Sequence, residues 1–470
     1  MAVRSVGDLA IVLHSHMPYV EGFGTYPFGE EWLFDAFARS HLPVLDVAER
    51  LTMTVTPVLA DQLEAEGVGE RMLRFLRRHR VDAADRDVAD AGVTLRPAAK
   101  AEAAHYTRAI ERLRRLGGNP LRAFQEAHAK GRIELMGSAA THAVLPKLAT
   151  KAGRRLQVDA GLRSHERRFG PPVGFWLPEC AYSTGLDALL AERGLAYTCL
   201  DQSAHEGGTA ALSPIRLRGG PVAFTIDWPT VRLVWSEHGY PADPHYLEYH
   251  RLSANGIRLW SIGDRPYDPA PAARRASEHA AWFLGAVRDR LDRHRQERGR
   301  RGLCVFAIDT ELLGHWWAEG PIWLREVLRG AEHDRVRLLT LSAALGEHEP
   351  EVRSARESSW GEGKSLETWD SPAVADMVWA TRRSELRLLR AFAAGRLSET
   401  AATRAARELL ALQSSDWAFM DHRGQAGDYP YARATAHAED LLEAIDSGDP
   451  AEPRVRNLAP DLHLAPLAEP

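Results

Sequence analysis

The stretch CVFAIDTELLGHWW, residues 304–317, places an apolar run directly before a carboxylate. The hydrophobic residues before Asp309 favour a short buried strand, and Asp309 follows at the point where that strand ends. A glycine turn comes next, and then His315 and Trp316. Such a segment is unusual for a protein core, whereas a polar edge beside aromatic faces is typical of a surface that binds carbohydrate.

Several other short apolar runs also end in polar residues, and helical patterns lie between many of them. Strands and helices that alternate in this way predict a parallel sheet wrapped by helices. Both a (β/α) barrel and a flat doubly wound sheet place polar residues at the carboxyl ends of strands, so periodicity leaves both folds open. The predicted strands are residues 9–13, 52–58, 133–136, 173–177, 197–200, 305–308 and 337–341, and the predicted helices include 122–130, 154–169, 185–193 and 272–294.

Composition divides the chain further. A highly charged helical stretch interrupts the sheet pattern early in the chain, and a region rich in aromatic residues, Pro and Gly at 203–271 predicts loops and short strands over the active face. After about residue 371 the pattern becomes helical. We therefore expect a catalytic unit of residues 1–64 and 121–350, an inserted helical subdomain at 65–120, a C-terminal helical domain at 351–446 and a loosely ordered tail at 447–470.

The composition argues against several classes of function. The 59 basic and 64 acidic residues give a formal net charge of −5, without the concentrated basic field of a general nucleic-acid-binding protein. No apolar run approaches the ~20 residues that span a membrane, and the N-terminus lacks the apolar stretch of a signal peptide. Cys180, Cys199 and Cys304 lie in or beside apolar runs without zinc-type spacing, which favours reduced, buried thiols and a cytoplasmic location.

Glu179 and Asp309 both follow apolar strands, in GFWLPE and CVFAID. They are far apart in sequence, but both could point into one cleft at the same edge of a sheet. Cleavage of a glycosidic bond requires two carboxylates on either side of a sugar ring. A carboxylate at a strand end is more often structural, so neither residue is diagnostic alone.

His14 and His16 follow the first strand and, two residues apart, face the same way. Three interpretations stay open for this pair: buried core histidines, ligands of a divalent metal, or donors to sugar hydroxyls and to the carboxylates. Asp416 and Trp417 also pair a carboxylate with an aromatic ring, after the helical pattern at 398–412. They fit either a sugar-binding edge or a helix N-cap.

Five motifs in this order resemble those of glycoside hydrolase family 57. GFWLPE and ELLGHWW are the most discriminating of them, and together the five span nearly the whole chain. The motifs are HSHMPYV at 14–20, ELMGSAATH at 134–142, GFWLPECAYS at 174–183, IDTELLGHWWAEG at 308–320 and SDWAFMD at 415–421.

The resemblance implies an incomplete (β/α)7 barrel with an inserted helical subdomain and a C-terminal helical domain. It also implies that Glu179 is the nucleophile and Asp309 the acid/base of a metal-independent, retaining reaction that needs no cofactor. Further residues are expected to bind the sugar. They are His14, His16, His142, Trp176, His315, Trp316, Asp416 and Trp417.

Within the family the chain looks most like the 1,4-α-glucan branching enzymes. The segment 235–244 resembles their flexible loop, with Tyr240 at its aromatic position, and Trp260, Trp360 and Trp369 resemble aromatic residues of their glucan cleft. Ile308 and Thr310 beside the acid/base, Ala418 in the fifth motif and a short C-terminal part depart from the family pattern. These departures bear on the balance between transfer and hydrolysis.

The expected function is therefore the formation of α-1,6 branches on an α-glucan, in a protein that binds neither nucleic acid nor a membrane and is a monomer or a homodimer. A plain α-glucan hydrolase of the same family is the main alternative. A metal-dependent carbohydrate deacetylase that uses the two first-strand histidines, and a non-catalytic glucan-binding protein, are two others.

Overall fold

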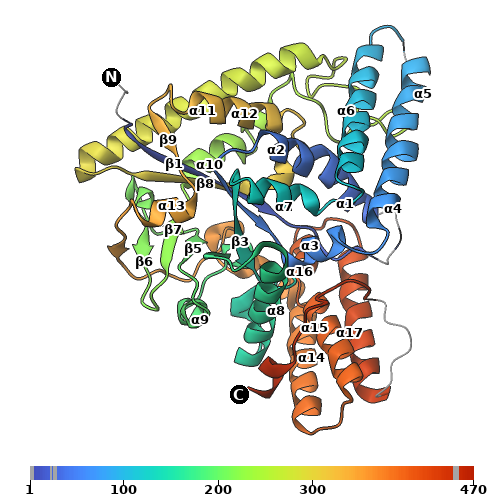
Figure 1. Ribbon diagram of the computed structural model, residues 1–470, viewed down its shortest axis with the longest axis vertical. Coiled ribbons are helices and arrows are strands. Elements are labelled where there is room, and N and C mark those ends of the chain that lie inside the picture. The colour runs from blue at the N-terminus through green and yellow to red at the C-terminus, as the bar shows by residue number, and fades with distance from the viewer. Residues whose placement is uncertain (1–4, 22–23, 25–28, 91, 448–454, 470) are drawn as a thin grey trace.

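One mainly parallel sheet forms the centre of the molecule (Figure 1). The computed structural model describes residues 5–21, 24, 29–90, 92–447 and 455–469. In this part of the chain the strand order is β10-β6-β7-β5-β4-β3-β2-β1-β8, and β9 pairs with β1. The strands are β1 (Gly7–Ser15), β2 (Leu51–Val55), β3 (Ile133–Ser138), β4 (Gly174–Trp176), β5 (Tyr197–Leu200), β6 (Ile215–Arg216), β7 (Val222–Thr225), β8 (Leu303–Asp309), β9 (Val336–Leu338) and β10 (Glu351–Val352).

The sheet curls into a barrel that closes at a single point. A parallel bridge joins Ile226, just past β7, to Val305 in β8. Because β7 and β8 lie at opposite ends of the seven-strand run β7-β5-β4-β3-β2-β1-β8, this bridge excludes the flat doubly wound alternative. β7 lies in the region 203–271, for which loops and short strands over the active face were predicted. β7 is such a short strand, but it belongs to the barrel wall instead of the loops over the active face.

The register of β1 sets the position of its histidines. All nine residues of β1 are buried, as expected for a parallel strand covered on both faces. His14 of β1 is paired with Thr54 of β2 on one side and with Asp309 of β8 on the other. The carboxyl edge of the barrel therefore places an imidazole beside a carboxylate.

Helices cover the outside of the barrel, as the alternating pattern predicted. The 30-residue helix α11 (Pro269–Arg298) begins at Asp268, whose side chain accepts a hydrogen bond from the Ala270 N–H, and it packs along α12 (Gly320–Gly330) (Figure 1). The remaining helices of this layer are α1 (Glu30–Ala36), α2 (Leu42–Val47), α3 (Pro57–Leu63), α7 (Arg122–Ala129), α8 (Lys151–Phe169), α9 (Leu186–Glu192), α10 (Trp228–Val234) and α13 (Leu341–Leu345). Of the described helices, none is both long enough and apolar enough to cross a membrane.

The charged stretch at 65–120 forms a helical arm. It contains α4 (Val68–Phe75), α5 (Asp82–Asp90) and α6 (Arg96–Arg115), and α5 and α6 lie side by side at the edge of the molecule (Figure 1). The Arg39 guanidinium of the barrel donates to the Glu102 carboxylate of α6 at 2.8 Å, and both side chains are buried. This ion pair fixes the arm to the barrel.

Four helices form the C-terminal unit, namely α14 (Ala375–Ala393), α15 (Glu399–Leu412), α16 (Ser415–His422) and α17 (Tyr429–Ser447). They lie beside α8 (Figure 1). The expectation of a loosely ordered tail was wrong for residues 455–469. Val455, Leu458 and Leu467 are buried in the cluster formed by these helices, because apolar residues spaced among the prolines supply anchors that composition alone does not reveal. Residues 448–454 lie outside the described residues.

Candidate active site

Glu179 lies in a strained turn directly after β4. The 3-10 turn Pro178–Cys180 holds Glu179 at φ 59° and Cys180 at φ 50°, in the left-handed region that residues other than glycine rarely occupy. Such backbone strain is found mainly where the surrounding structure needs one side chain in a particular direction. The Trp360 N–H donates to the Glu179 carbonyl at 3.0 Å and helps to hold the turn.

Two side chains from distant parts of the chain donate to the Glu179 carboxylate. The Trp360 indole N–H donates to Oε2 at 2.8 Å, and the Ser415 hydroxyl donates to Oε1, also at 2.8 Å. His142 Nδ1 lies 3.5 Å from Oε1. The carboxylate is thereby fixed, and its ionised form is stabilised by hydrogen bonds.

Asp309 ends β8 in a different environment. Among the described residues, no hydrogen-bond donor reaches its carboxyl group. Burial raises the pKa of Asp309 well above its usual value, and the nearby carboxylates of Glu311 and Glu179 raise it further. Burial also raises the pKa of Glu179, but the hydrogen bonds from Trp360 and Ser415 oppose this rise. The proton of the pair therefore belongs on Asp309.

The raised pKa of Asp309 leads to a prediction about stability. Because the folded state holds this proton more tightly than an unfolded chain with a pKa of about 3.9, stability falls as pH rises through the range between the two values. We expect Asp309→Asn, which cannot ionise, to have a higher Tm than the wild type at pH 8, with a smaller difference at pH 3. Thermal unfolding at both pH values measures this, and a difference in Tm that does not grow with pH contradicts it.

Three histidines pack together beside the carboxylates. The rings of His14 and His142 lie 4.8 Å apart, and those of His16 and His142 lie 4.0 Å apart. The Thr54 hydroxyl, on β2, lies 2.5 Å from His14 Nδ1 and orients that ring. The Thr56 hydroxyl, just past β2, lies 3.0 Å from His16 Nδ1 and does the same for His16. His14 Nε2 lies 2.9 Å from His142 Nε2, and His16 Nε2 lies 3.0 Å from Asp416 Oδ2.

The histidines differ in charge. Burial lowers the pKa of His14 and of His142 well below the usual value, so these two rings are neutral. Burial acts on His16 in the same direction, but Asp416 and the Glu179 carboxylate outweigh it, and the pKa of His16 is raised. The raised pKa of His16 favours its protonated form beside the carboxylates of Asp416, Glu179 and Glu311.

The hydrogen bonds of the first-strand histidines bear on whether these rings are metal ligands or hydrogen-bond partners of the carboxylates and a sugar. All four ring nitrogens of His14 and His16 already have protein partners. Within the described residues, no group of three or more His, Cys, Asp or Glu side chains is arranged to hold a metal ion. The geometry favours hydrogen bonding to the carboxylates and to a ligand over metal ligation.

The predicted site residues differ in how open they are. The side chains of Glu179, His16 and Asp416 are 13%, 12% and 15% exposed, so a ligand can reach them. Trp176 is fully buried, and its ring stacks on His14 at 4.7 Å. Substrate contact by Trp176 stays a prediction, and in this structure its ring supports His14 from within the core.

Trp417 is also a core residue. Its side chain is fully buried and its indole N–H donates to the Ala411 carbonyl at 2.8 Å. Consecutive helical residues point about 100° apart, so Trp417 of α16 faces the helical core while Asp416 faces His16. Substrate contact by Trp417 stays a prediction, and the structure gives its ring a packing role.

We expect Trp417→Ala to lower the free energy of unfolding by about 3–5 kcal/mol, because it removes a large buried side chain and leaves a cavity. Chemical denaturation measures the loss. Trp379→Ala on α14 is the matched control, since that indole is 57% exposed and its removal is expected to change stability by less than about 0.5 kcal/mol. Equal losses in the two variants contradict the assignment of Trp417 to the core.

Four other predicted residues lie away from the carboxylate pair. Tyr240 stacks on His279 of α11 with the ring centroids 4.4 Å apart, and Trp260 packs under Arg251. His315 is buried, and Trp316, which is half exposed, stacks on Tyr249 at 4.4 Å. No contact among the described residues joins these four to Glu179 or Asp309. Gly314, at φ 106°, makes a turn between Asp309 and His315. A side chain at this position would collide with the Arg39 carbonyl, so glycine is required there.

Several residues of the site were not found from the sequence. Ser415 links His142 Nδ1, at 2.8 Å, to the Glu179 carboxylate. Glu311 accepts a hydrogen bond from the His16 N–H at 3.2 Å and lies 2.8 Å from His41 Nε2. Ser415 stands one position before Asp416, and Glu311 stands two positions after Asp309, so both lie inside motifs already quoted. This proximity to predicted site residues was the only sequence signal for their role.

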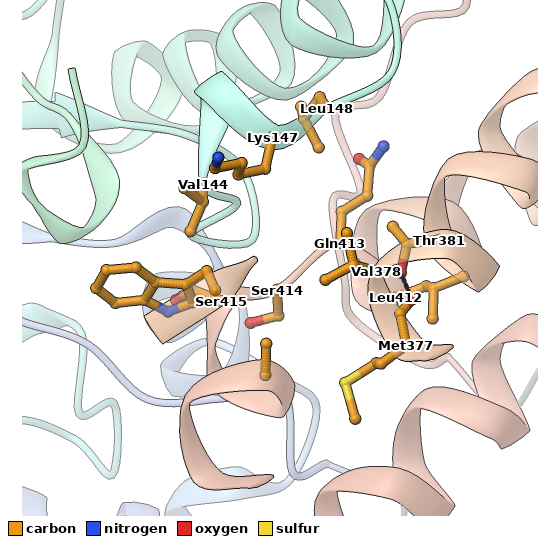
Figure 2. A pocket seen from close by; sticks show the side chains of 12 residues that line it. Val144, Lys147, Leu148, Met377, Val378, Thr381, Leu412, Gln413, Ser414 and Ser415 are labelled. Atoms are coloured by element: carbon orange, nitrogen blue, oxygen red, sulfur yellow. Dashed lines mark hydrogen bonds between the residues drawn. The ribbon is translucent and has the colours of Figure 1, made fainter. Parts of the chain in front are cut away.

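A small pocket of about 50 Å³ lies between the barrel and the C-terminal helices, beside this cluster (Figure 2). Val144, Lys147 and Leu148 of the barrel form one wall, and Met377 and other residues of the C-terminal helices form the opposite wall. Trp369 also lines the pocket, and so does Ser415, whose hydroxyl donates to Glu179.

Comparison with known proteins agrees with this geometry. The profile described as Glycosyl hydrolase family 57 matches residues 10–355, and the profile of the C-terminal region of 1,4-alpha-glucan branching enzyme matches residues 378–460. A 1,4-alpha-glucan branching enzyme of Thermococcus kodakarensis is 32% identical over 93% of this chain and 73% of its own length. A probable 1,4-alpha-glucan branching enzyme of Mycobacterium tuberculosis is 33% identical over 93% of this chain and 91% of its own length.

Solved structures agree as well. The GH57-type branching enzyme from Pyrococcus horikoshii has a TM-score of 0.91 at 31% identity, covering 98% of this chain and 97% of that one. The α-amylase AmyC from Thermotoga maritima has a TM-score of 0.85 at 26% identity, covering 99% of each chain. A curled parallel barrel with paired carboxylates at its carboxyl edge defines a carbohydrate-active barrel enzyme. The chain belongs to glycosyl hydrolase family 57, which confirms the predicted family and the incomplete (β/α)7 barrel with its C-terminal helical domain.

Proposed function

We propose that this protein is a 1,4-α-glucan branching enzyme, which cleaves an α-1,4 bond and transfers the chain to a glucan 6-hydroxyl. The observation that carries the proposal is the convergence of Glu179 and Asp309 in one buried cluster, where the charge of Glu179 raises the pKa of Asp309. The names of the related enzymes and the match of residues 378–460 support branching over plain hydrolysis.

In the proposed mechanism Glu179 is the nucleophile and Asp309 the acid and base. Protonated Asp309 donates to the glycosidic oxygen while the Glu179 carboxylate attacks the anomeric carbon, and the released chain leaves. Asp309, now ionised, then removes the proton from an incoming 6-hydroxyl, which attacks the covalent intermediate and frees Glu179. The different environments of the two carboxyl groups suit these two roles.

Other residues are proposed to hold the substrate. His16 and Asp416 would donate to and accept from sugar hydroxyls. Trp360 would contact the chain beside Glu179, and Trp369 would contact it at the pocket of Figure 2. His14 and His142, which are buried in the cluster, would keep these groups in place. Sugar contacts by Tyr240, Trp260, His315 and Trp316 stay predictions, at positions removed from the bond that is cleaved.

Trp360 provides a test of how Glu179 is held. Trp360→Phe keeps an aromatic ring but removes the donor to Glu179 Oε2, so we expect kcat to fall about 10- to 100-fold, by analogy with other hydrogen bonds to charged groups. The pKa of Glu179 should also rise, which moves the acid limb of the pH–rate profile to higher pH. Kinetics across pH measure both effects. Trp282→Phe on α11 is a matched control, and an unshifted acid limb in Trp360→Phe contradicts the proposed role.

The branching activity is tested directly by incubating the enzyme with amylose. Proton NMR should show the anomeric signal of new α-1,6 linkages, and debranching followed by chain analysis gives the length transferred. An increase in reducing ends without α-1,6 signals would instead favour an α-glucan hydrolase, an alternative kept open by the similarity to the α-amylase AmyC.

We also propose a cytoplasmic location and an α-glucan as the substrate of a monomer or homodimer. The three cysteines are buried free thiols, which suits a reducing compartment. For the organisation of the chain we propose the division into 1–64 with 121–350, 65–120 and 351–446. Profile matches at 10–355 and 378–460 support the separation of the barrel from the last of these units.

A further inference from the structure

A second polar pocket lies beside the loop that carries Trp360. It has a volume of about 400 Å³, opens to solvent, and is lined by residues of the segments 203–211, 227–232 and 363–364 and by Arg290. In the part of the chain that the structure describes, it shares no lining residue with the pocket of Figure 2. The proposed mechanism uses none of its residues.

Most charges around this pocket are already paired. Lys364 Nζ donates to Asp201 Oδ2 at 2.6 Å, and Arg353 donates to Glu206 Oε1 at 2.9 Å. Arg290 pairs with Asp227. The pocket is therefore polar but nearly neutral, which suits an uncharged ligand better than a strongly anionic one.

Two polar groups at the pocket lack partners. The Glu206 side chain is only 8% exposed, and its Oε2 atom has no hydrogen-bond donor among the described residues. A buried carboxylate oxygen without a partner is costly, and a ligand hydroxyl would satisfy it. Arg232 lines the same pocket, is exposed, and forms no ion pair with any described carboxylate, so it offers free donors.

An aromatic wall completes the pocket. The Trp228 indole, at the start of α10, is half-buried, and Lys364 Nζ lies 2.9 Å from its ring centroid. An acceptor, donors and an apolar ring in one pocket suit a polyhydroxyl ligand with an apolar face. A phosphate group needs donors only and would be repelled by the Glu206 carboxylate.

We propose that this pocket binds a second α-glucan segment outside the catalytic groove. The choice of α-glucan rests on the proposed function, whereas the pocket itself does not. Glu206 Oε2 accepts from a sugar hydroxyl, Arg232 donates to another, and the sugar contacts the part of the Trp228 indole that Lys364 leaves uncovered.

The pocket is connected to the catalytic centre through one short loop. The Ser359 N–H donates to the Lys364 carbonyl at 3.2 Å, and the Lys364 N–H donates to the Gly361 carbonyl at 3.1 Å. Trp360, in the middle of this loop, donates to Glu179. A glucan held against Lys364 therefore lies one turn from Trp360, near the place where an acceptor chain is needed.

The test counts binding sites for maltoheptaose by isothermal titration calorimetry in the full chain carrying Glu179→Gln, which prevents turnover. We expect two sites per chain. Adding Glu206→Gln or Arg232→Ala should weaken one of them at least tenfold and leave the other unchanged. Arg232 is exposed, so its variant is expected to fold normally, and Glu349→Gln, a change at an exposed carboxylate elsewhere, should leave both sites intact.

The outcomes separate this inference from the proposed function. A single site in the Glu179→Gln protein, or two sites that neither pocket variant affects, overturns the inference. A titration with inorganic phosphate gives a further check. If phosphate binds the protein and Arg232→Ala abolishes that binding, the pocket is an anion site and the inference is overturned. Two maltoheptaose sites, one weakened by the pocket variants, in a protein whose wild type forms no α-1,6 linkages from amylose would count against the proposed function and leave the pocket proposal standing.

Discussion

Glu179→Gln is expected to lower kcat on amylose by roughly 10⁴- to 10⁶-fold, the range seen when the nucleophile of a covalent mechanism is removed. The amide cannot attack the anomeric carbon, and no second carboxylate is held in the same turn. Gln keeps the shape of the side chain. Its amide oxygen can still accept from the Trp360 indole, and its NH2 group can donate to the Ser415 hydroxyl. Glucan binding and Tm are therefore expected to change little.

Initial rates by reducing-end and α-1,6 assays measure this loss, and calorimetry with a maltooligosaccharide confirms that binding is retained. Glu362→Gln is a matched control, because that carboxylate is largely exposed in the same loop as Trp360. Turnover within tenfold of the wild type in Glu179→Gln would remove Glu179 as the nucleophile.

Asp309→Asn is expected to lower kcat on amylose by about 10²- to 10⁴-fold, the range for loss of a general acid/base. The loss should depend on the leaving group. A glycosyl fluoride needs no proton to depart, so its first step should proceed almost normally in the variant, and the second step should become rate-limiting. The wild-type rate on amylose should fall as pH rises through the raised pKa of Asp309, because the acid is then ionised.

The pH–rate profile and the leaving-group dependence together check this prediction. The basic limb attributed to Asp309 should be missing in Asp309→Asn. An equal loss of rate on amylose and on the glycosyl fluoride, with the basic limb unchanged, would contradict an acid/base role for Asp309.

Features that follow from local sequence could be predicted. Glu179 and Asp309 each follow an apolar strand, and residues at the ends of parallel strands meet at one edge of the sheet. The same rule placed His14 and His16 on one face, and β1 pairing then set His14 beside Asp309. These relations depend only on the period of a strand and the direction of the sheet.

Features that depend on long-range packing could not be predicted. Ser415 reaches Glu179 from 236 positions away in the sequence, and nothing near Ser415 marks that contact. Trp176 lies three positions before Glu179, and Trp417 directly follows Asp416. Residues close in sequence can point in different directions, and both of these rings are buried. Burial of an aromatic ring depends on what packs against it, which the motif does not contain.

The central claim is that Glu179 attacks the sugar while Asp309 serves as acid and base, and trapping the covalent intermediate tests it most directly. The Asp309→Asn variant is incubated with a maltooligosaccharyl fluoride, digested, and analysed by mass spectrometry. The account predicts a glycosyl adduct on the peptide that contains Glu179. An adduct on a different carboxylate, or no adduct together with release of the inverted β-anomer, would contradict it.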